Sequence, residues 1–171
     1  MTKILSYSFS LTPPTPPAPP ALTEQLHEFA YSEFLIGLPA HWKQIPSAVD
    51  NTITFQSDTH GAAIIISADF YEIAEAKAQA VAERCLGSRL EALEQATPGR
   101  VSVLRRSIKP HSGGVGLELA LVAETPEQVH IYLGHVTSRK ILNFALVGRP
   151  GTQAAAALFD KTITNYRPKF P

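Results

Sequence analysis

The sequence predicts an α+β domain, a mostly antiparallel sheet of about six to seven strands with helices packed on its faces. Short segments rich in β-branched or alternating apolar residues fill most of the chain. Only two segments have helical periodicity, and the strands follow one another in series instead of alternating with helices. The expected order is β-β-β-α-β-β-β-β-α, an α/β/α sandwich.

The N-terminal segment differs in composition from the rest of the chain. Residues 13–20 read PPTPPAPP, which favours an extended polyproline conformation over helix or central strand. We therefore expect residues 1–21 to form a Pro-rich arm and residues 22–171 to form one domain. A spacer is the favoured role of the arm, and a ligand for an aromatic groove is the alternative.

Three strands are expected before the first helix. Phe34–Ile36 leads into a bend at Leu38–Trp42, and Thr52–Phe55 alternates in strand fashion. Ala62–Ile66 is apolar on both faces, which is typical of a central strand covered on both sides.

Two segments are predicted to be helical. Residues 75–96 are rich in helix formers, although Gly87 could interrupt them, and Pro98-Gly99 ends the element. Their apolar stripe consists of Ala82, Leu86, Leu90 and Leu93. A second helix is expected over 152–166, with Thr152 as its N-cap.

Between the helices lie four expected strands, at 101–108, 115–123, 128–137 and 140–147. A two-residue turn at Ser138-Arg139 would place Leu133 opposite Phe144. A three-residue loop at Thr125–Glu127 would place Leu119 opposite Leu133. This register puts one set of large apolar residues on a single face: Leu117, Leu119, Leu121, Ile131, Leu133, Leu142, Phe144 and Leu146.

The opposite face would then combine small apolar residues and glycines with a few polar side chains. Either a helix or the N-terminal arm packs there, or the face is an open groove for an apolar partner. For the second case we expect partner contacts from Tyr132, His130, Glu118 and Asn143, with Trp42 as an anchor near the rim. The alternative for Trp42 is a core position.

Composition argues against several classes of function. The 15 basic residues balance the 15 acidic ones, so no net field attracts nucleic acid, and near-zero charge favours self-association, for example as a homodimer. The single cysteine, Cys85, permits no intrachain disulfide and is expected to be a small apolar residue of the helix. No signal peptide or membrane span is recognisable, so a cytoplasmic location without membrane insertion is expected.

No motif predicts catalysis, a metal or a cofactor. His130 and His135 are separated by an odd number of residues in one strand and therefore point to opposite faces. His60 and His111 fall in turns, and no nucleophile elbow or metal-binding spacing is present. The protein is not expected to be an enzyme.

The chain nevertheless resembles a known family. Phe34–Trp42 reads FLIGLPAHW, Asn51–Phe55 reads NTITF, and His135–Arg149 reads HVTSRKILNFALVGR. With the long helix and a last helix containing Leu158-Phe159, these segments resemble the PsbP-like α/β/α sandwich over about Phe29 to Pro168. That superfamily includes a photosystem extrinsic protein, a yeast Ran-binding import factor and a bacterial branch of unknown function.

The bacterial branch includes Eag-type chaperones of type VI secretion effectors. The resemblance therefore implies a dimeric cytoplasmic adaptor that shields the apolar helices of a secreted effector. An immunity-type or structural interaction protein is the second hypothesis, and a small-molecule-binding domain is the third. The Pro-rich arm departs from the family pattern, and no catalytic residue can be carried over.

Overall fold

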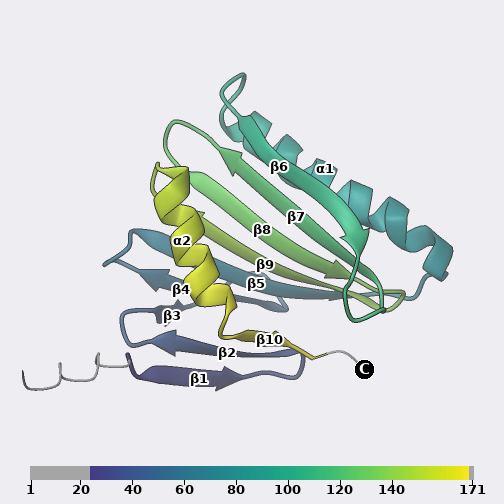
Figure 1. The fold of residues 1–171 in the computed structure, drawn as a ribbon, viewed down its shortest axis with the longest axis horizontal. Coiled ribbons are helices and arrows are strands. Elements are labelled where there is room, and N and C mark those ends of the chain that lie inside the picture. The colour runs from purple at the N-terminus through teal and green to yellow at the C-terminus, as the bar shows by residue number, and fades with distance from the viewer. Residues whose placement is uncertain (1–23, 170–171) are drawn as a thin grey trace, which may run out of the picture.

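The computed structural model describes residues 24–169, so the Pro-rich arm expected at residues 1–21 lies outside the described residues. Within this range the chain forms two antiparallel sheets and two helices (Figure 1), which confirms the α+β class. The small sheet has the order β1 (Leu26–Ala30), β2 (Phe34–Pro39), β10 (Tyr166–Pro168). The large sheet has the order β3 (Lys43–Ile45), β4 (Thr52–Ser57), β5 (Ala62–Phe70), β9 (Lys140–Gly148), β8 (Val129–Val136), β7 (Leu117–Glu124), β6 (Ser102–Pro110).

The three strands expected before the first helix correspond to β2, β4 and β5, and the four expected after it correspond to β6 to β9. The order differs from the expected one by three short strands, β1, β3 and β10. Their three to five residues are too few for a clear alternation of apolar and polar positions.

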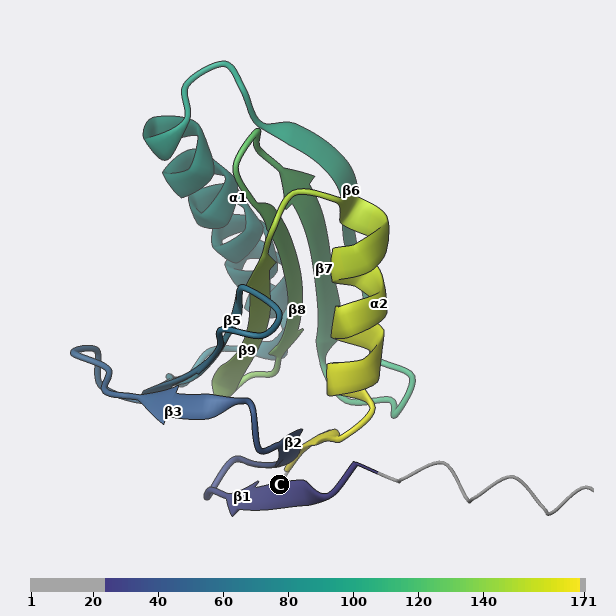
Figure 2. The ribbon, with the colours of Figure 1, turned by 90° about the vertical axis from the view of Figure 1, so that its left-hand side faces the viewer.

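The two helices cover opposite faces of the large sheet, as Figure 2 shows. α1 (Ala78–Ala96) follows a 3-10 turn at Glu75–Lys77, and Gly87 does not interrupt it. α2 (Thr152–Ile163) ends before residue 166 because the chain turns there into β10. In the described range, neither helix combines the length and the apolar character that crossing a membrane requires.

Thr152 is not the N-cap of α2, which corrects the expectation. Gly151 holds that position with a φ of 117°, a backbone conformation that favours glycine. Thr152 is the first helical residue, and its hydroxyl donates a hydrogen bond of 2.7 Å to Glu124 Oε2 at the end of β7. The side chain therefore ties α2 to the sheet instead of capping the helix.

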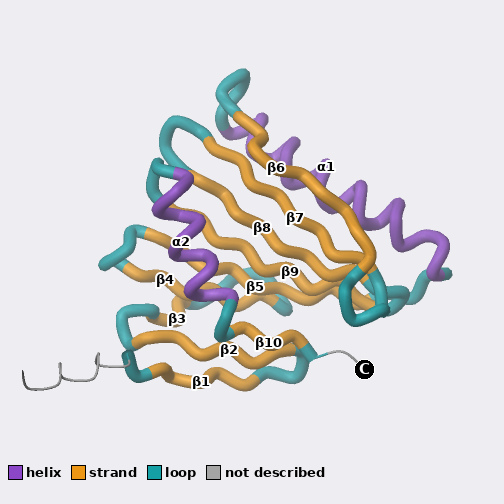
Figure 3. The backbone as a smooth tube through the Cα atoms, viewed as in Figure 1, coloured by secondary structure: helices purple, strands orange, loops and turns teal. Residues whose placement is uncertain are grey.

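On the α2 side, the small sheet and α2 together cover the large sheet (Figure 3). One core joins the two sheets, formed by Phe34, Ile36, Leu38, Trp42, Phe55, Ala62, Ile64, Ile66, Phe144 and Leu146. Phe144 contacts Phe159 of α2 and Tyr166 of β10, with ring centroids 5.6 Å and 4.9 Å away. The buried Lys140 also joins the sheets, because its ammonium group donates to Glu33 and to the Lys169 carbonyl.

The predicted register is correct for one hairpin and wrong for the next. Leu133 pairs with Phe144, as expected from the Ser138-Arg139 turn. Leu119, however, pairs with Gly134, and Ala120 pairs with Leu133. Gln128 belongs to the turn, because the Thr125 amide donates to the Gln128 carbonyl at 2.9 Å, which leaves Pro126-Glu127 as a two-residue loop. Because the loop has two residues instead of the predicted three, the pairing moves by one residue, which turns every side chain of β7 to the other face.

This shift gives the large sheet a core on each face. Leu119 and Leu121 of β7 pack under α1 against Ala82 and Leu86, together with Tyr132. Ile131, Phe144 and Leu146 remain on the α2 side. The apolar residues expected on one face are thus divided between two helices.

Because both sheets share one core, we predict that Phe144→Ala lowers the free energy of unfolding by about 3–5 kcal/mol. Phe144 is 1% exposed, and truncation would leave a cavity between α2, β10 and the sheet. Urea unfolding measures the loss. Phe70→Ala is the matched control, since Phe70 is 57% exposed and its truncation should cost less than about 0.5 kcal/mol. Equal losses for the two variants would contradict the shared core.

Candidate functional site

The α1-side face of the large sheet is only partly covered. α1 packs mainly on β6, β7 and β8, and Ile141 and Ala145 of β9 belong to the same buried cluster. β5 and the end of β9 at Val147 continue beyond the helix. Two adjoining cavities of about 270 and 500 Å³ lie along this boundary, and both are lined by Arg89 and Ala92. We call them the α1 groove, lined by Val81, Arg84, Cys85, Ser88, Arg89 and Ala92 of α1 and by Ile65, Ser67, Ile141, Asn143, Ala145 and Val147 of the sheet.

A chain of hydrogen bonds crosses the floor of the groove from β8 to β5. The Tyr132 hydroxyl donates to Asn143 Oδ1 at 2.6 Å, and Asn143 Nδ2 donates to Ser67 Oγ at 3.1 Å. Gly134 makes the first bond possible, because a Cβ there would lie 2.1 Å from the Tyr132 hydroxyl oxygen. Three strands are therefore joined by side chains as well as by their backbone ladders.

Tyr132 is also held from above by α1. The Cys85 sulfur lies 3.3 Å from the Tyr132 hydroxyl oxygen, and the Arg89 guanidinium carbon lies 3.8 Å from the ring centroid, a cation–π arrangement. Burial raises the pKa of Tyr132 far above its ordinary value, with a further contribution from Cys85. Burial likewise raises the pKa of Tyr71, which lines the same groove, to about 12. Both phenols stay neutral at physiological pH and can donate hydrogen bonds.

The structure brings together three of the five residues expected to contact a partner. Tyr132, Asn143 and His130 lie on the α1 side, where Tyr132 and Asn143 are buried and His130 lines the smaller cavity. Glu118 lies on the opposite face, because the register of β7 is shifted. Trp42 is 5% exposed and lies in the core between the sheets, which is the alternative position given above for this residue. The five residues do not form one surface, and their contact with a partner stays a prediction.

The remaining polar clusters join elements of the fold. His41 Nδ1 lies 3.0 Å from Ser57 Oγ, and His41 Nε2 lies 3.3 Å from Glu24 Oε1. This order of groups resembles a serine–histidine–acid triad, but Ser57 is fully buried and its Oγ also accepts the His60 amide at 3.4 Å. Because its side chain is fully buried, Ser57 has the geometry of a link between β4 and the segments that precede β1 and follow β2. No spacing in the sequence indicated this cluster.

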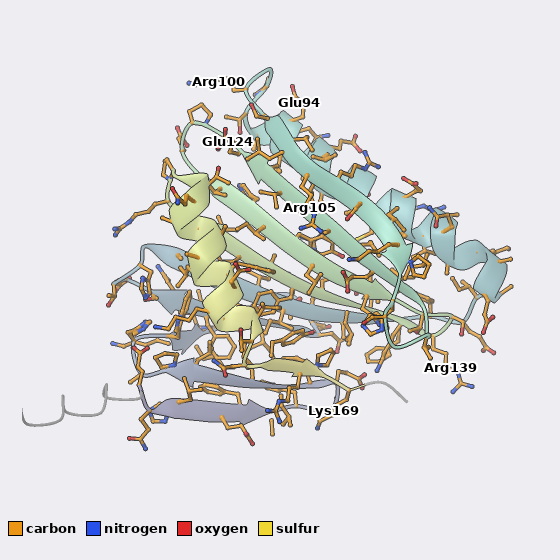
Figure 4. All side chains as sticks on the ribbon, in the orientation of Figure 1. Glu94, Arg100, Arg105, Glu124, Arg139 and Lys169 are labelled. Carbon is orange, nitrogen blue, oxygen red and sulfur yellow. The ribbon has the colours of Figure 1, made fainter. Side chains whose placement is uncertain are left out.

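The other sequence features are placed as follows. His130 and His135 point to opposite faces, as expected, and His111 packs edge-on against His135 with ring centroids 4.4 Å apart. Arg105 and Arg106 also point to opposite sides of β6: Arg106 pairs with Glu83 of α1, and Arg105 lies on the α2 side (Figure 4). Among residues 24–169, no group of three or more metal-binding side chains is brought together.

Comparison with known proteins supports the fold. The sequence matches no known family profile and no curated protein. Among solved structures, cyanobacterial PsbP (CyanoP) from Synechocystis sp. PCC 6803 is similar with a TM-score of 0.60 and 13% identity, covering 89% of this chain and 97% of that one. A Bacteroides thetaiotaomicron protein gives a TM-score of 0.44 at 10% identity, covering 86% of this chain and 49% of that one. The chain has a PsbP-like fold.

The stability of the protein should fall as the pH falls through the titration range of its histidines. Burial lowers the pKa of His130 below its ordinary 6.5, and burial is also the main cause of the lowered pKa values of His60 and His135. Below pH 6.5 the unfolded chain therefore binds protons that the folded chain does not. We predict a lower Tm at about pH 5.5 than at pH 7.5. A His130 imidazole that titrates above 6.5 by NMR would contradict this explanation.

Removing the Tyr132 hydroxyl should weaken the fold measurably. Tyr132→Phe leaves the buried Asn143 Oδ1 without its closest donor, so we predict a loss of about 1–3 kcal/mol in the free energy of unfolding. Tyr31→Phe is the control, because the Tyr31 hydroxyl makes only an exposed contact of 3.5 Å to Gln44. If chemical denaturation gives the same small effect for both, the hydrogen-bond chain contributes nothing to stability.

Proposed function

We propose that this protein is a non-enzymatic protein-binding domain that receives an apolar helix of a secreted bacterial effector in the α1 groove. It would act in the cytoplasm as an adaptor or chaperone. The observation that carries the proposal is the uncovered part of the sheet beside α1, where Ile65, Ala145 and Val147 line an open cavity. The class of client rests on the family resemblance, and the expected homodimer stays a prediction.

The uncovered part of the sheet has room for one helix. Neighbouring strands are about 4.8 Å apart and packed helices about 8–10 Å apart. A helix beside α1 would therefore lie over β9 and β5, with β4 at its outer edge. β5 has nine residues, a length of about 30 Å, which corresponds to a helix of about 20 residues.

The groove side of α1 suits close packing of a second helix. Val81, Cys85, Ser88 and Ala92 follow one another at intervals of four, three and four residues, so they form one stripe along the helix. Their side chains are small, which allows another helix to approach. The middle of the groove floor also has short side chains, at Ser67, Ile141 and Asn143, whereas Asp69 and Tyr71 line one end of it.

A synthetic amphipathic peptide of about 20 residues, with Leu and Ala on one face of its helix, tests this function. The peptide should raise the Tm of the protein in a concentration-dependent manner, because it binds the folded state. Ala92→Trp should abolish the shift, since Ala92 lines both cavities. Ala80→Trp is the matched control: Ala80 is exposed on the same helix and lines neither cavity, so this variant should keep the shift.

The proposal fails if the peptide causes no shift with the unsubstituted protein. It also fails if Ala92→Trp and Ala80→Trp respond alike, because binding would then occur outside the α1 groove. A folded client domain that binds while isolated helices do not would favour the immunity-type alternative.

A further inference from the structure

Arg89 occupies the centre of the α1 groove, where both cavities meet. Its guanidinium lies on the ring of Tyr132, which fixes the group against the floor. No carboxylate within residues 24–169 forms an ion pair with Arg89, and its buried Nε has no hydrogen-bond partner there. The groove thus presents a positioned cation with unused donors.

The other charged groups along the groove do not neutralise this cation. Arg84 and Asp69 both line the larger cavity, and both are exposed. The titratable groups that line the smaller cavity are Arg89, His130 and Tyr132. Burial lowers the pKa of His130 and raises that of Tyr132, so both are neutral at pH 7. Two arginines and one aspartate leave the lining positive at neutral pH.

An occupant of the groove would change the environment of Arg89. In the open groove, water can solvate the guanidinium, but a docked helix would remove that water. Arginine cannot lose its proton in a protein, so a purely apolar occupant would leave an unpaired charge in a dry interface. A carboxylate on the occupant removes this cost and can accept two parallel hydrogen bonds from the guanidinium.

We infer that Arg89 recognises an acidic side chain carried on the otherwise apolar face of the helix that docks in the α1 groove. This inference rests on the proposed function and narrows it, because it specifies one Glu or Asp near the middle of the client helix. Purely apolar helices would then bind less tightly, which gives the domain a means of selecting among clients.

Two peptides test the inference by isothermal titration calorimetry. They share the amphipathic sequence described above and differ only at one central position of the apolar face, which is Glu in one and Gln in the other. We expect the Glu peptide to bind the unsubstituted protein at least about tenfold more tightly than the Gln peptide. The preference should disappear in Arg89→Gln and persist in Arg84→Gln, which removes the other groove cation.

The outcomes separate this inference from the proposed function. Equal affinity of the two peptides for the unsubstituted protein overturns the role of Arg89 while leaving the groove as the docking site. Absence of binding by both peptides overturns the docking of a helix and the role of Arg89 together. If Arg89→Gln does not fold, the inference is still tested by the other two proteins. A preference for the Glu peptide over the Gln peptide in both the unsubstituted protein and Arg84→Gln supports it, and equal affinities overturn it.

Discussion

The turn between β7 and β8 determines how the two faces of the large sheet are covered. Pro126-Glu127 forms a two-residue loop closed by Thr125 and Gln128, and this length pairs Leu121 with Tyr132. The leucines of β7 therefore face α1 and hold that helix over β6, β7 and β8. Had the loop contained one residue less, the same leucines would lie on the α2 side, and α1 would lose its main apolar contacts. The position of α1, and with it the open area over β9 and β5, depends on this register.

The two faces of the sheet differ in how completely they are covered. On one face, α2 and the small sheet share a continuous core, in which Phe144 is surrounded by aromatic rings from both. On the other face a single helix covers part of the sheet, and the polar chain of Tyr132, Asn143 and Ser67 marks the boundary. A polar chain with satisfied hydrogen bonds is stable beside water, whereas an apolar floor of that size would favour aggregation. The groove can therefore stay open in the absence of a partner.

The sequence predicted most of the fold and the position of three of the five proposed contact residues on the α1 side, for identifiable physical reasons. The helical periodicity of residues 75–96 and the short turn at Ser138-Arg139 both depend on local sequence, and both predictions were confirmed. The register of β7 was wrong because Thr-Pro-Glu-Gln is compatible with loops of two or three residues, and only tertiary packing distinguishes them. Tyr132 and Asn143 were placed together correctly because they lie in one hairpin. Arg89 was missed because nothing in the sequence of α1 shows which of its two arginines, Arg84 or Arg89, lies over a tyrosine of β8.

The proposed role of the α1 groove as the surface that receives a helix has a direct test. Mapping of amide chemical-shift changes by NMR on addition of the Glu-containing peptide tests it most directly. We expect the largest changes at residues that line the groove, namely Ile65, Ser67 and Val147 on the sheet and Ser88 and Ala92 on α1. Changes confined to the small sheet, to the edge strand β6 or to α2 would contradict it.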